Sequence, residues 1–421
     1  MRRPVVLLIT AASMALAAQA RAVEPDEVVA TYAEIGAAMY ADSLASAQAL
    51  DRAVDAFLSA PSKEAHEAVK AAWKAARVPY QQTEALRFGN PLVDEWEGRV
   101  NAWPLDEGLI DYVDMSYGDS SEENPLYTLN VVASPQLRVG KDVVDASEIT
   151  PDLLSDQLQE ALDVETNVAI GYHAVEFLLW GQDLNGTGPG AGMRPWTDYS
   201  LEQCTGGHCE RRRAYLSAAT DLLVTDLQEM ADAWKPGGAA RKDLTSVAPE
   251  AGIGRILTGI GSLSYGELAG ERMKLGLLLN DPEEEHDCFS DNTHNSHYYD
   301  QVGMTALWSG SYQRLDGSVV QGPSVQALAA EKAPDLAQKV TGLMDDTTAK
   351  LGAIREAAES GRMAYDQMLA ADNAEGNGML QAAVDALVAQ TRGVEEVVAA
   401  LGVAITVEGS DSLDDPAAVA P

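Results

Sequence analysis

A histidine and a glutamate, His173 and Glu176, stand three residues apart in the sequence Gly-Tyr-His-Ala-Val-Glu at positions 171–176. Residues i and i+3 of an α-helix share a face, so the imidazole and the carboxylate can bind one metal ion or hydrogen-bond each other. The surrounding sequence predicts a single helix from residue 152 to about residue 180. Gly171 inside such a helix would serve close packing or a kink. The spacing therefore indicates either a metal site or a structural hydrogen bond on a core-facing stripe.

A second polar stripe precedes this segment. Its members follow one another at spacings of four, three, four and three and so share one helix face: Trp73, Arg77, Tyr80, Glu84 and Arg87. Buried charges must be paired or bound to a ligand. One interpretation is an internal salt-bridge network of Arg77, Glu84 and Arg87. The other places Glu84 opposite His173 and Glu176, completing a site of one imidazole and two carboxylates.

A third group lies in a polar stretch at 286–297, which holds His286, His294 and His297 together with Asp287 and Cys288. Mixed nitrogen and oxygen ligands of this kind suit iron, zinc or copper. The Asp-Asn-Thr sequence at 291–293 can equally cap helices and form turns. Both interpretations remain open for this loop.

Three segments resemble the imelysin family, in particular its branch called iron-regulated protein A. The first is the Gly-x-His-x-x-Glu signature at 171–176 with Phe-Leu-Leu-Trp-Gly-Gln-Asp after it. The second is 73–89, followed by Asn-Ala-Trp-Pro-Leu-Asp at 101–106, and the third is 285–295. The resemblance implies two similar helical halves packed together and a bound metal, although the family is also classed among metallopeptidases.

The resemblance also implies a set of ligands. Metal-binding members carry a carboxylate on the second helix, which points to Glu84 beside His173 and Glu176. They tend to carry another carboxylate one turn on, where this chain has Arg87. That departure favours an anionic ligand or an iron chelate, which arginine would accept. We therefore expect accessory roles at the positions named here: Arg77, Arg87, Asp106 and His294.

The amino terminus has the pattern of a secretory signal at residues 1–22. Arg2 and Arg3 precede a short apolar stretch, and small residues allow cleavage near Ala20 or Ala22. No later stretch approaches the roughly 20 apolar residues that a transmembrane helix requires. We expect an exported, periplasmic protein with no transmembrane segment.

The formal net charge of −36 repels nucleic acid and anionic membranes and attracts cations. It excludes nucleic acid as a partner, but an acidic surface usually serves solubility and names no metal. Among the three cysteines, Cys204 and Cys209 could close a short loop in an oxidising compartment. Glu210 follows the second of them, so covalent haem attachment is not expected, and Cys288 is left over.

Helix-favouring, alanine-rich sequence dominates the chain, and runs rich in β-branched residues are almost absent. We predict an all-α protein of two packed helical bundles joined by long irregular loops. The predicted bundles cover residues 23–205, with the His-x-x-Glu motif, and 206–408. A disordered acidic tail is expected at 409–421.

These observations lead to three hypotheses. The first is binding of iron, or of an iron-containing ligand, in the periplasm, with a role in iron uptake or homeostasis beside a transport partner in the inner or outer membrane. The second is a metal-dependent peptidase with Glu176 as general base, although the chain lacks the His-Glu-x-x-His motif. The third is an envelope interaction module without metal. Iron is the expected cofactor, with zinc or copper as alternatives.

Overall fold

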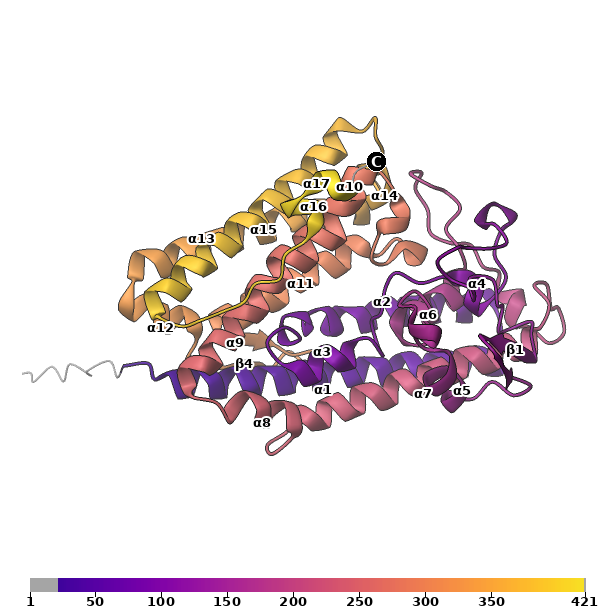
Figure 1. The fold of residues 1–421 in the computed structure, drawn as a ribbon, viewed down its shortest axis with the longest axis horizontal. Coiled ribbons are helices and arrows are strands. Elements are labelled where there is room, and N and C mark those ends of the chain that lie inside the picture. Colours follow the sequence, from indigo (N-terminus) through magenta and orange to yellow (C-terminus); the bar gives the residue numbers. More distant parts are fainter. Residues whose placement is uncertain (1–21, 420–421) are drawn as a thin grey trace, which may run out of the picture.

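The computed structural model describes residues 22–419 (Figure 1). The predicted signal peptide lies outside this range except for Ala22. No helix within the described range is long and apolar enough to cross a bilayer.

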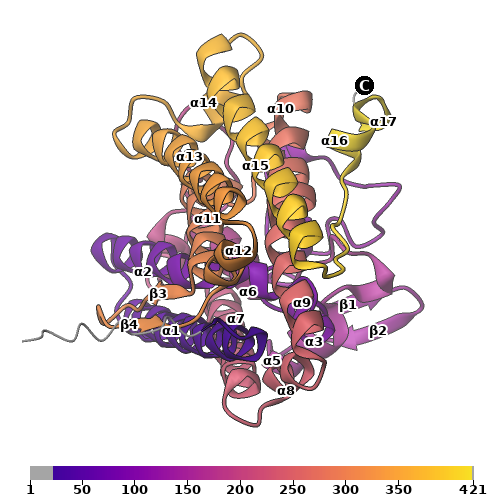
Figure 2. The ribbon, with the colours of Figure 1, turned by 90° about the vertical axis from the view of Figure 1, so that its left-hand side faces the viewer.

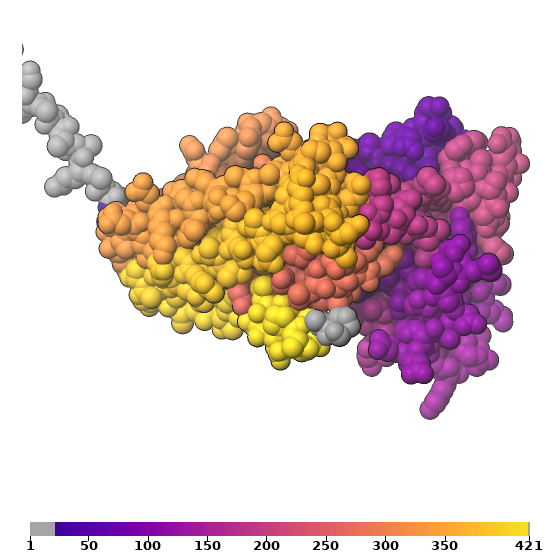
Figure 3. Space-filling view, turned by 90° about the horizontal axis from the view of Figure 1, so that it is seen from above, coloured from indigo at the N-terminus to yellow at the C-terminus, as the bar shows by residue number. Residues whose placement is uncertain are grey.

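Long helices form two tiers, which can be told apart in both ribbon views and pack against each other (Figure 1, Figure 2). The lower tier contains α1 (Pro25–Ser59), α2 (Lys63–Gln81) and α7 (Cys209–Trp234). The upper tier contains α11 (Thr293–Ser309), α13 (Pro334–Glu359) and α15 (Ala374–Leu401). From above, the orange and yellow carboxyl-terminal helices cover one end of the molecule and the purple and magenta segments form the other (Figure 3).

One continuous helical segment connects the tiers. It begins as α9 (Pro249–Ser262) against α1, continues through a π-helical stretch (Leu263–Lys274) against α15, and ends as α10 (Leu275–Leu279). The remaining elements are short. They are α3 (Pro91–Glu97), α4 (Glu107–Ile110), α5 (Pro151–Leu153), α6 (Gly171–Trp180), α8 (Ala239–Thr245), α12 (Val325–Lys332), α14 (Tyr365–Leu369), α16 (Asp411–Asp414), α17 (Pro416–Val419) and the antiparallel hairpins β1–β2 (Gln136–Val139, Asp142–Asp145) and β3–β4 (Ser311–Gln313, Val319–Gln321).

Local sequence explains how the long helices begin and pack. The Ser62 hydroxyl accepts a hydrogen bond from the Ala65 amide and caps α2. In the lower tier, Tyr40 stacks on Trp234 with ring centroids 6.2 Å apart. A Cβ on Gly36 would lie 2.9 Å from the Trp234 ring, so this glycine lets α1 approach α7 closely. The predicted all-α class is confirmed.

The helix predicted over 152–180 is interrupted. A short helical stretch ends near Leu158, Glu160 and Leu162 adopt left-handed backbone conformations, and α6 begins only at Gly171. Gly171 has φ +86°, and a Cβ there would lie 2.7 Å from the carbonyl oxygen of Val100. Gly171 therefore starts the helix against a neighbouring chain segment instead of lying inside it.

Two further features differ from the prediction. Helix α7 packs along α1, so the first bundle extends past the predicted boundary at residue 205. Residues 409–419, expected to be a disordered tail, form α16 and α17, and the Ser412 hydroxyl donates to the Gly270 carbonyl at 3.0 Å. A Cβ on Gly266 would lie 2.7 Å from the Glu408 carbonyl oxygen, so this glycine lets the tail lie closely over the π-helical stretch. Cys204 and Cys209 form a disulfide in the structure.

Candidate metal centre

Helix α6 places His173 and Glu176 together in the interior. All ten residues of α6 are buried, and the indole nitrogen of Trp73 on α2 donates to the carbonyl of Tyr172 at 2.9 Å. His173 Nδ1 lies 3.0 Å from Glu176 Oε2. The other oxygen of Glu176 accepts a hydrogen bond from the Ser290 amide at 2.9 Å. The helix is thereby joined to the loop that precedes α11.

That loop supplies two more groups, His286 and Asp287. Asp287 Oδ2 accepts from Asn292 Nδ2 at 2.9 Å and from the Ser296 hydroxyl, and the Asp287 amide donates to the Thr293 hydroxyl at 3.0 Å. Asn292 and Thr293 therefore hold Asp287 in place. Neither residue caps a helix through its side chain, since Asn292 at the start of α11 makes no side-chain cap hydrogen bond.

His173, His286 and Asp287 each offer a ligand atom, and these atoms lie within 4.8 Å of one another. Asp287 Oδ1 is 4.0 Å from His173 Nδ1 and 3.9 Å from His286 Nδ1. All three side chains are at most 1% exposed. Within residues 22–419, neither Nε2 of His173 nor Nδ1 of His286 has a hydrogen-bond partner. Each imidazole therefore keeps one ring nitrogen unused in the protein interior, where such a group costs free energy unless it is bound.

Burial and the neighbouring positive charges favour the neutral form of both imidazoles. Burial, reinforced by the positive charges of Arg77 and Arg272, lowers the pKa of His173 to about 3. Burial and Arg272 likewise lower the pKa of His286 well below its usual value. A neutral imidazole has the lone pair that a metal requires.

The carboxylates respond to different neighbours. Burial opposes ionisation of Asp287, but Arg77, whose Nη2 lies 2.7 Å from Asp287 Oδ1, holds the pKa of Asp287 below its usual range. Burial and the charge of Asp287 raise the pKa of Glu176. The group thus combines two nitrogen donors, one ionised oxygen donor and a nearby carboxyl that can hold a proton.

A cavity of about 580 Å³ borders His286. Asn101 and Trp103 line it beside the histidine, together with the half-exposed Asp94. Most of its other charged lining residues are acidic: Glu95, Glu97, Glu160, Glu165, Glu267 and Glu271. A mainly acidic lining of this kind concentrates cations over anions.

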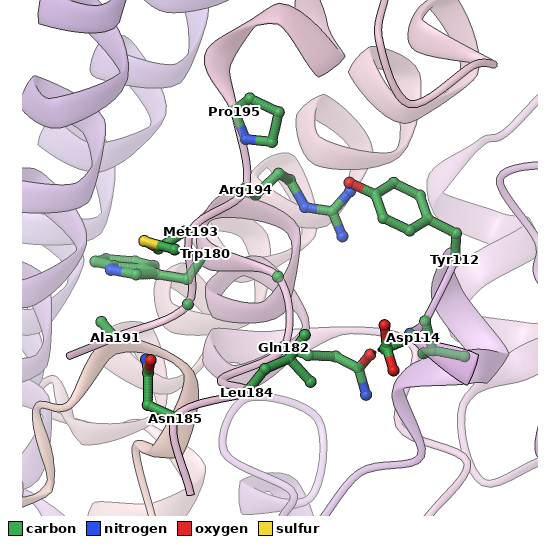
Figure 4. A pocket seen from close by; sticks show the side chains of 13 residues that line it. Tyr112, Asp114, Trp180, Gln182, Leu184, Asn185, Ala191, Met193, Arg194 and Pro195 are labelled. Atoms are coloured by element: carbon green, nitrogen blue, oxygen red, sulfur yellow. Dashed lines mark hydrogen bonds between the residues drawn. The ribbon is translucent and has the colours of Figure 1, made fainter. Parts of the chain in front are cut away.

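A second cavity, of about 400 Å³, lies past the carboxyl end of α6 (Figure 4). Tyr112, Trp180, Met193 and Arg194 line it, and the Arg194 guanidinium pairs with Asp111 at 2.7 Å. Its lining, within the part of the chain that the structure describes, includes no histidine or cysteine. This cavity therefore lacks the imidazole and thiolate donors of a transition-metal site, and Met193 offers only a thioether.

The predicted third ligand, Glu84, belongs to a different set of contacts. Helix α2 ends at Gln81, so Glu84 leaves the predicted stripe, and its Oε2 pairs with Arg272 Nη2 at 2.6 Å. Arg272 also pairs with Asp300 at 3.1 Å. The carboxylate that joins His173 and His286 is Asp287, not Glu84.

The predicted accessory residues also have other partners. Arg87 pairs with Asp94 at 2.7 Å, so the expected network of Arg77, Glu84 and Arg87 with one another does not form among the described residues. The Asp106 carboxylate accepts from the Thr166 hydroxyl at 2.7 Å within a loop. His294 Nε2 lies 3.1 Å from the exposed Glu359.

Sequence reasoning missed Asn101, which links Arg77 to His286. Its amide oxygen accepts a hydrogen bond from Arg77 Nη1, and its amide nitrogen lies 3.5 Å from His286 Nε2. Its place in the family-like segment at 101–106 was the available signal. Ser290, which binds Glu176 through its backbone amide, had no side-chain signal at all.

These features define an all-α protein of two helical tiers with a buried histidine–carboxylate group where they meet. The family model for imelysin matches residues 36–394. The chain therefore belongs to the imelysin family.

Similar proteins agree with this assignment. Iron-regulated protein A of Synechococcus elongatus is 34% identical over 71 residues, which cover 17% of this chain and only 20% of that protein. The fold resembles an iron-regulated protein A precursor from Parabacteroides distasonis, with TM-score 0.64 and 19% identity over 91% of this chain and 97% of that one. It also resembles an imelysin-like protein from Psychrobacter arcticus, with TM-score 0.57 and 15% identity over 91% and 99%. At these identities the structural matches show the fold alone.

Proposed function

We propose that this protein binds a transition-metal ion, with iron as the candidate, through His173, His286 and Asp287. Glu176 holds His173 in position or adds a second oxygen donor. The observation that carries the proposal is the pair of buried imidazole nitrogens left without partners among residues 22–419, beside an ionised carboxylate.

The donors fit the group. Two imidazoles and one carboxylate are a donor set typical of non-haem ferrous iron, and imidazoles also bind zinc and copper. The name of the Synechococcus relative favours iron among these metals. Arg77 balances the charge of Asp287 before a cation arrives.

We further propose that binding takes place in the periplasm and serves iron uptake or homeostasis, beside a transport partner in the membrane. The pattern of residues 1–22, the Cys204–Cys209 disulfide and the word precursor in the name of the Parabacteroides protein support export.

The peptidase alternative has less support from the geometry. A general base must reach a water beside the substrate. Glu176 is fully buried, with one oxygen beside His173 and the other accepting from Ser290. The neighbouring cavity is bordered by His286 instead.

The test is elemental analysis after anaerobic reconstitution with ferrous ion and desalting. We expect about one iron per chain in the parent and a loss of at least tenfold in His173→Ala and His286→Ala. His294→Ala is the matched control, because this histidine lies beside exposed Glu359, and it should keep its iron. Equal iron in all four proteins, or none in the parent, would overturn the proposal.

A further inference from the structure

A second group of acidic side chains lies apart from the histidines. Asp183 follows α6, Asp291 precedes α11 and Asp366 lies on α14, yet one oxygen from each lies within 4.8 Å of the others. Three separate chain segments therefore bring three carboxylates to one place.

This group contains buried oxygens that nothing in the described chain satisfies. Glu285 and Asp366 are each 1% exposed. Oδ2 of Asp366 and Oδ1 of Asp291 have no hydrogen-bond partner among residues 22–419. Burial, the charge of Asp366 and a hydrogen bond with it raise the pKa of Glu285 well above its usual value, so Glu285 holds a proton in the absence of a cation. A cation among these carboxylates would displace that proton and bind the two unpartnered aspartate oxygens.

The electrostatics agree with this geometry. Burial, together with the charges of Asp366 and Asp183, raises the pKa of Asp291 to about 7. Burial also raises the pKa of Asp366, to about 6, with a further increase from Asp183. The basic side chain that acts on Asp291 is Lys74, and its effect is smaller than that of the neighbouring carboxylates.

The donor chemistry selects a hard cation. Calcium binds oxygen ligands at about 2.3–2.6 Å, so two oxygens on opposite sides of one ion are about 5 Å apart. Separations within 4.8 Å allow all three aspartates to bind the same ion. Irregular loops suit calcium better than magnesium, which requires near-ideal octahedral geometry. We propose that Asp183, Asp291 and Asp366 form a calcium site, distinct from the histidine centre, with Glu285 as the adjoining carboxylate.

The proposed calcium site lies where it can hold three chain segments together. Asp183 lies three residues beyond the end of α6, and Asp291 lies four residues beyond Asp287. Asp291 Oδ2 also accepts from the Gly190 amide at 3.1 Å, in the loop that borders the cavity of Figure 4 near Asn185 and Ala191. A bound cation would join this loop, the segment carrying His286 and Asp287, and α14 of the upper tier.

The test is calcium titration of the full chain by isothermal calorimetry at about 0.15 M salt, which screens the general acidic surface. We expect a single tight site in the parent and an affinity at least tenfold lower in Asp291→Asn and Asp366→Asn. Asp142→Asn, on an exposed hairpin, makes the same charge change and should bind as the parent does. Magnesium should bind more weakly than calcium. Equal affinities in all variants, or no calcium binding by the parent, would overturn the proposal.

Thermal unfolding separates loss of the site from loss of the fold. In chelator, Asp366→Asn should unfold at or above the parent temperature, because it removes a buried, repelled charge. In calcium, the parent should become the more stable protein. A variant that is less stable in chelator and responds to calcium as the parent does would contradict the site. His173→Ala should keep its calcium response, so failure of the iron proposal leaves this one testable.

Discussion

The ion pair of Arg77 and Asp287 offers the sharpest test of how the centre is balanced. Arg77 is 1% exposed, Asp287 is fully buried, and their charged atoms are 2.7 Å apart. In Arg77→Met, Asp287 keeps its hydrogen bonds from Asn292 and Ser296 but loses its only ion-pair partner of fixed charge among the described residues. Removing one partner of a buried pair lowers the free energy of unfolding by about 3–5 kcal/mol.

The size of the thermal shift follows from the chain length. About 400 residues with an unfolding entropy near 2.1 cal/mol/K per residue give roughly 0.8 kcal/mol per degree, so the midpoint should fall by about 4–6 °C. Arg362→Met is the control, because Arg362 and Glu375 pair at the surface with side chains 49% and 67% exposed. Its midpoint should move by about 1 °C or less.

Metal provides the decisive second measurement. A cation at His173, His286 and Asp287 would replace Arg77 as the counter-ion of the carboxylate, so ferrous ion should raise the midpoint of Arg77→Met more than that of the parent. Differential scanning calorimetry with and without ferrous ion, under anaerobic conditions, measures both effects. A variant within about 1 °C of the parent, or one that metal does not restore, would refute the reasoning.

Three further substitutions test the site and the fold. Glu84→Gln should leave the iron content unchanged by elemental analysis. Guanidinium unfolding should show that the free energy of unfolding falls by only roughly 1–3 kcal/mol, because Arg272 keeps its other carboxylates. Loss of iron would instead support Glu84 as a ligand. Burial lowers the pKa of His66 to about 3. Below pH 6.5 the unfolded chain therefore binds a proton at this histidine that the folded chain does not bind, so the free energy of unfolding decreases as the pH falls from about 6.5 toward 3. At pH 5 the loss of stability from His66 amounts to about 2 kcal/mol. In denaturant titrations, His66→Gln should therefore reduce the stability difference between pH 7.5 and pH 5 by that amount. An unchanged difference would contradict the lowered pKa of His66. Gly171→Ala should lower stability by more than about 1 kcal/mol and reduce iron content, because of its positive φ, whereas Gly342→Ala in open space on α13 should be neutral or stabilising; equal behaviour of the two would be inconsistent with the strained position of Gly171.

The contact between His173 and Glu176 could be predicted because it depends on one turn of helix. Its 3.0 Å separation requires only that α6 be helical over four residues. The start of α6 could not be predicted in the same way. Gly171 adopts φ +86° because Val100, distant in sequence, lies against it, and helix propensity contains no information about that neighbour.

The place of Glu84 shows a second limit. Helical spacing aligned it with Arg77, but α2 ends at Gln81, and Arg272 approaches from 188 residues away. A pattern of spacings assumes that the helix continues, and the turn after Gln81 removes that assumption. The loop at 286–297 is rich in possible ligands, and the sequence pointed to His294 among its three histidines, whereas the structure places His286 beside His173.

The amino-acid sequence by itself determined the helical class, the shared face of His173 and Glu176 and the cysteine pair, because each depends on neighbours within a few residues. Only the tertiary structure decided that His286 and Asp287 join His173, that Arg77 neutralises Asp287 across 210 residues, and that Asp183, Asp291 and Asp366 converge. Contacts between distant segments depend on how the two tiers pack and where their loops turn. No local pattern of residues encodes that packing.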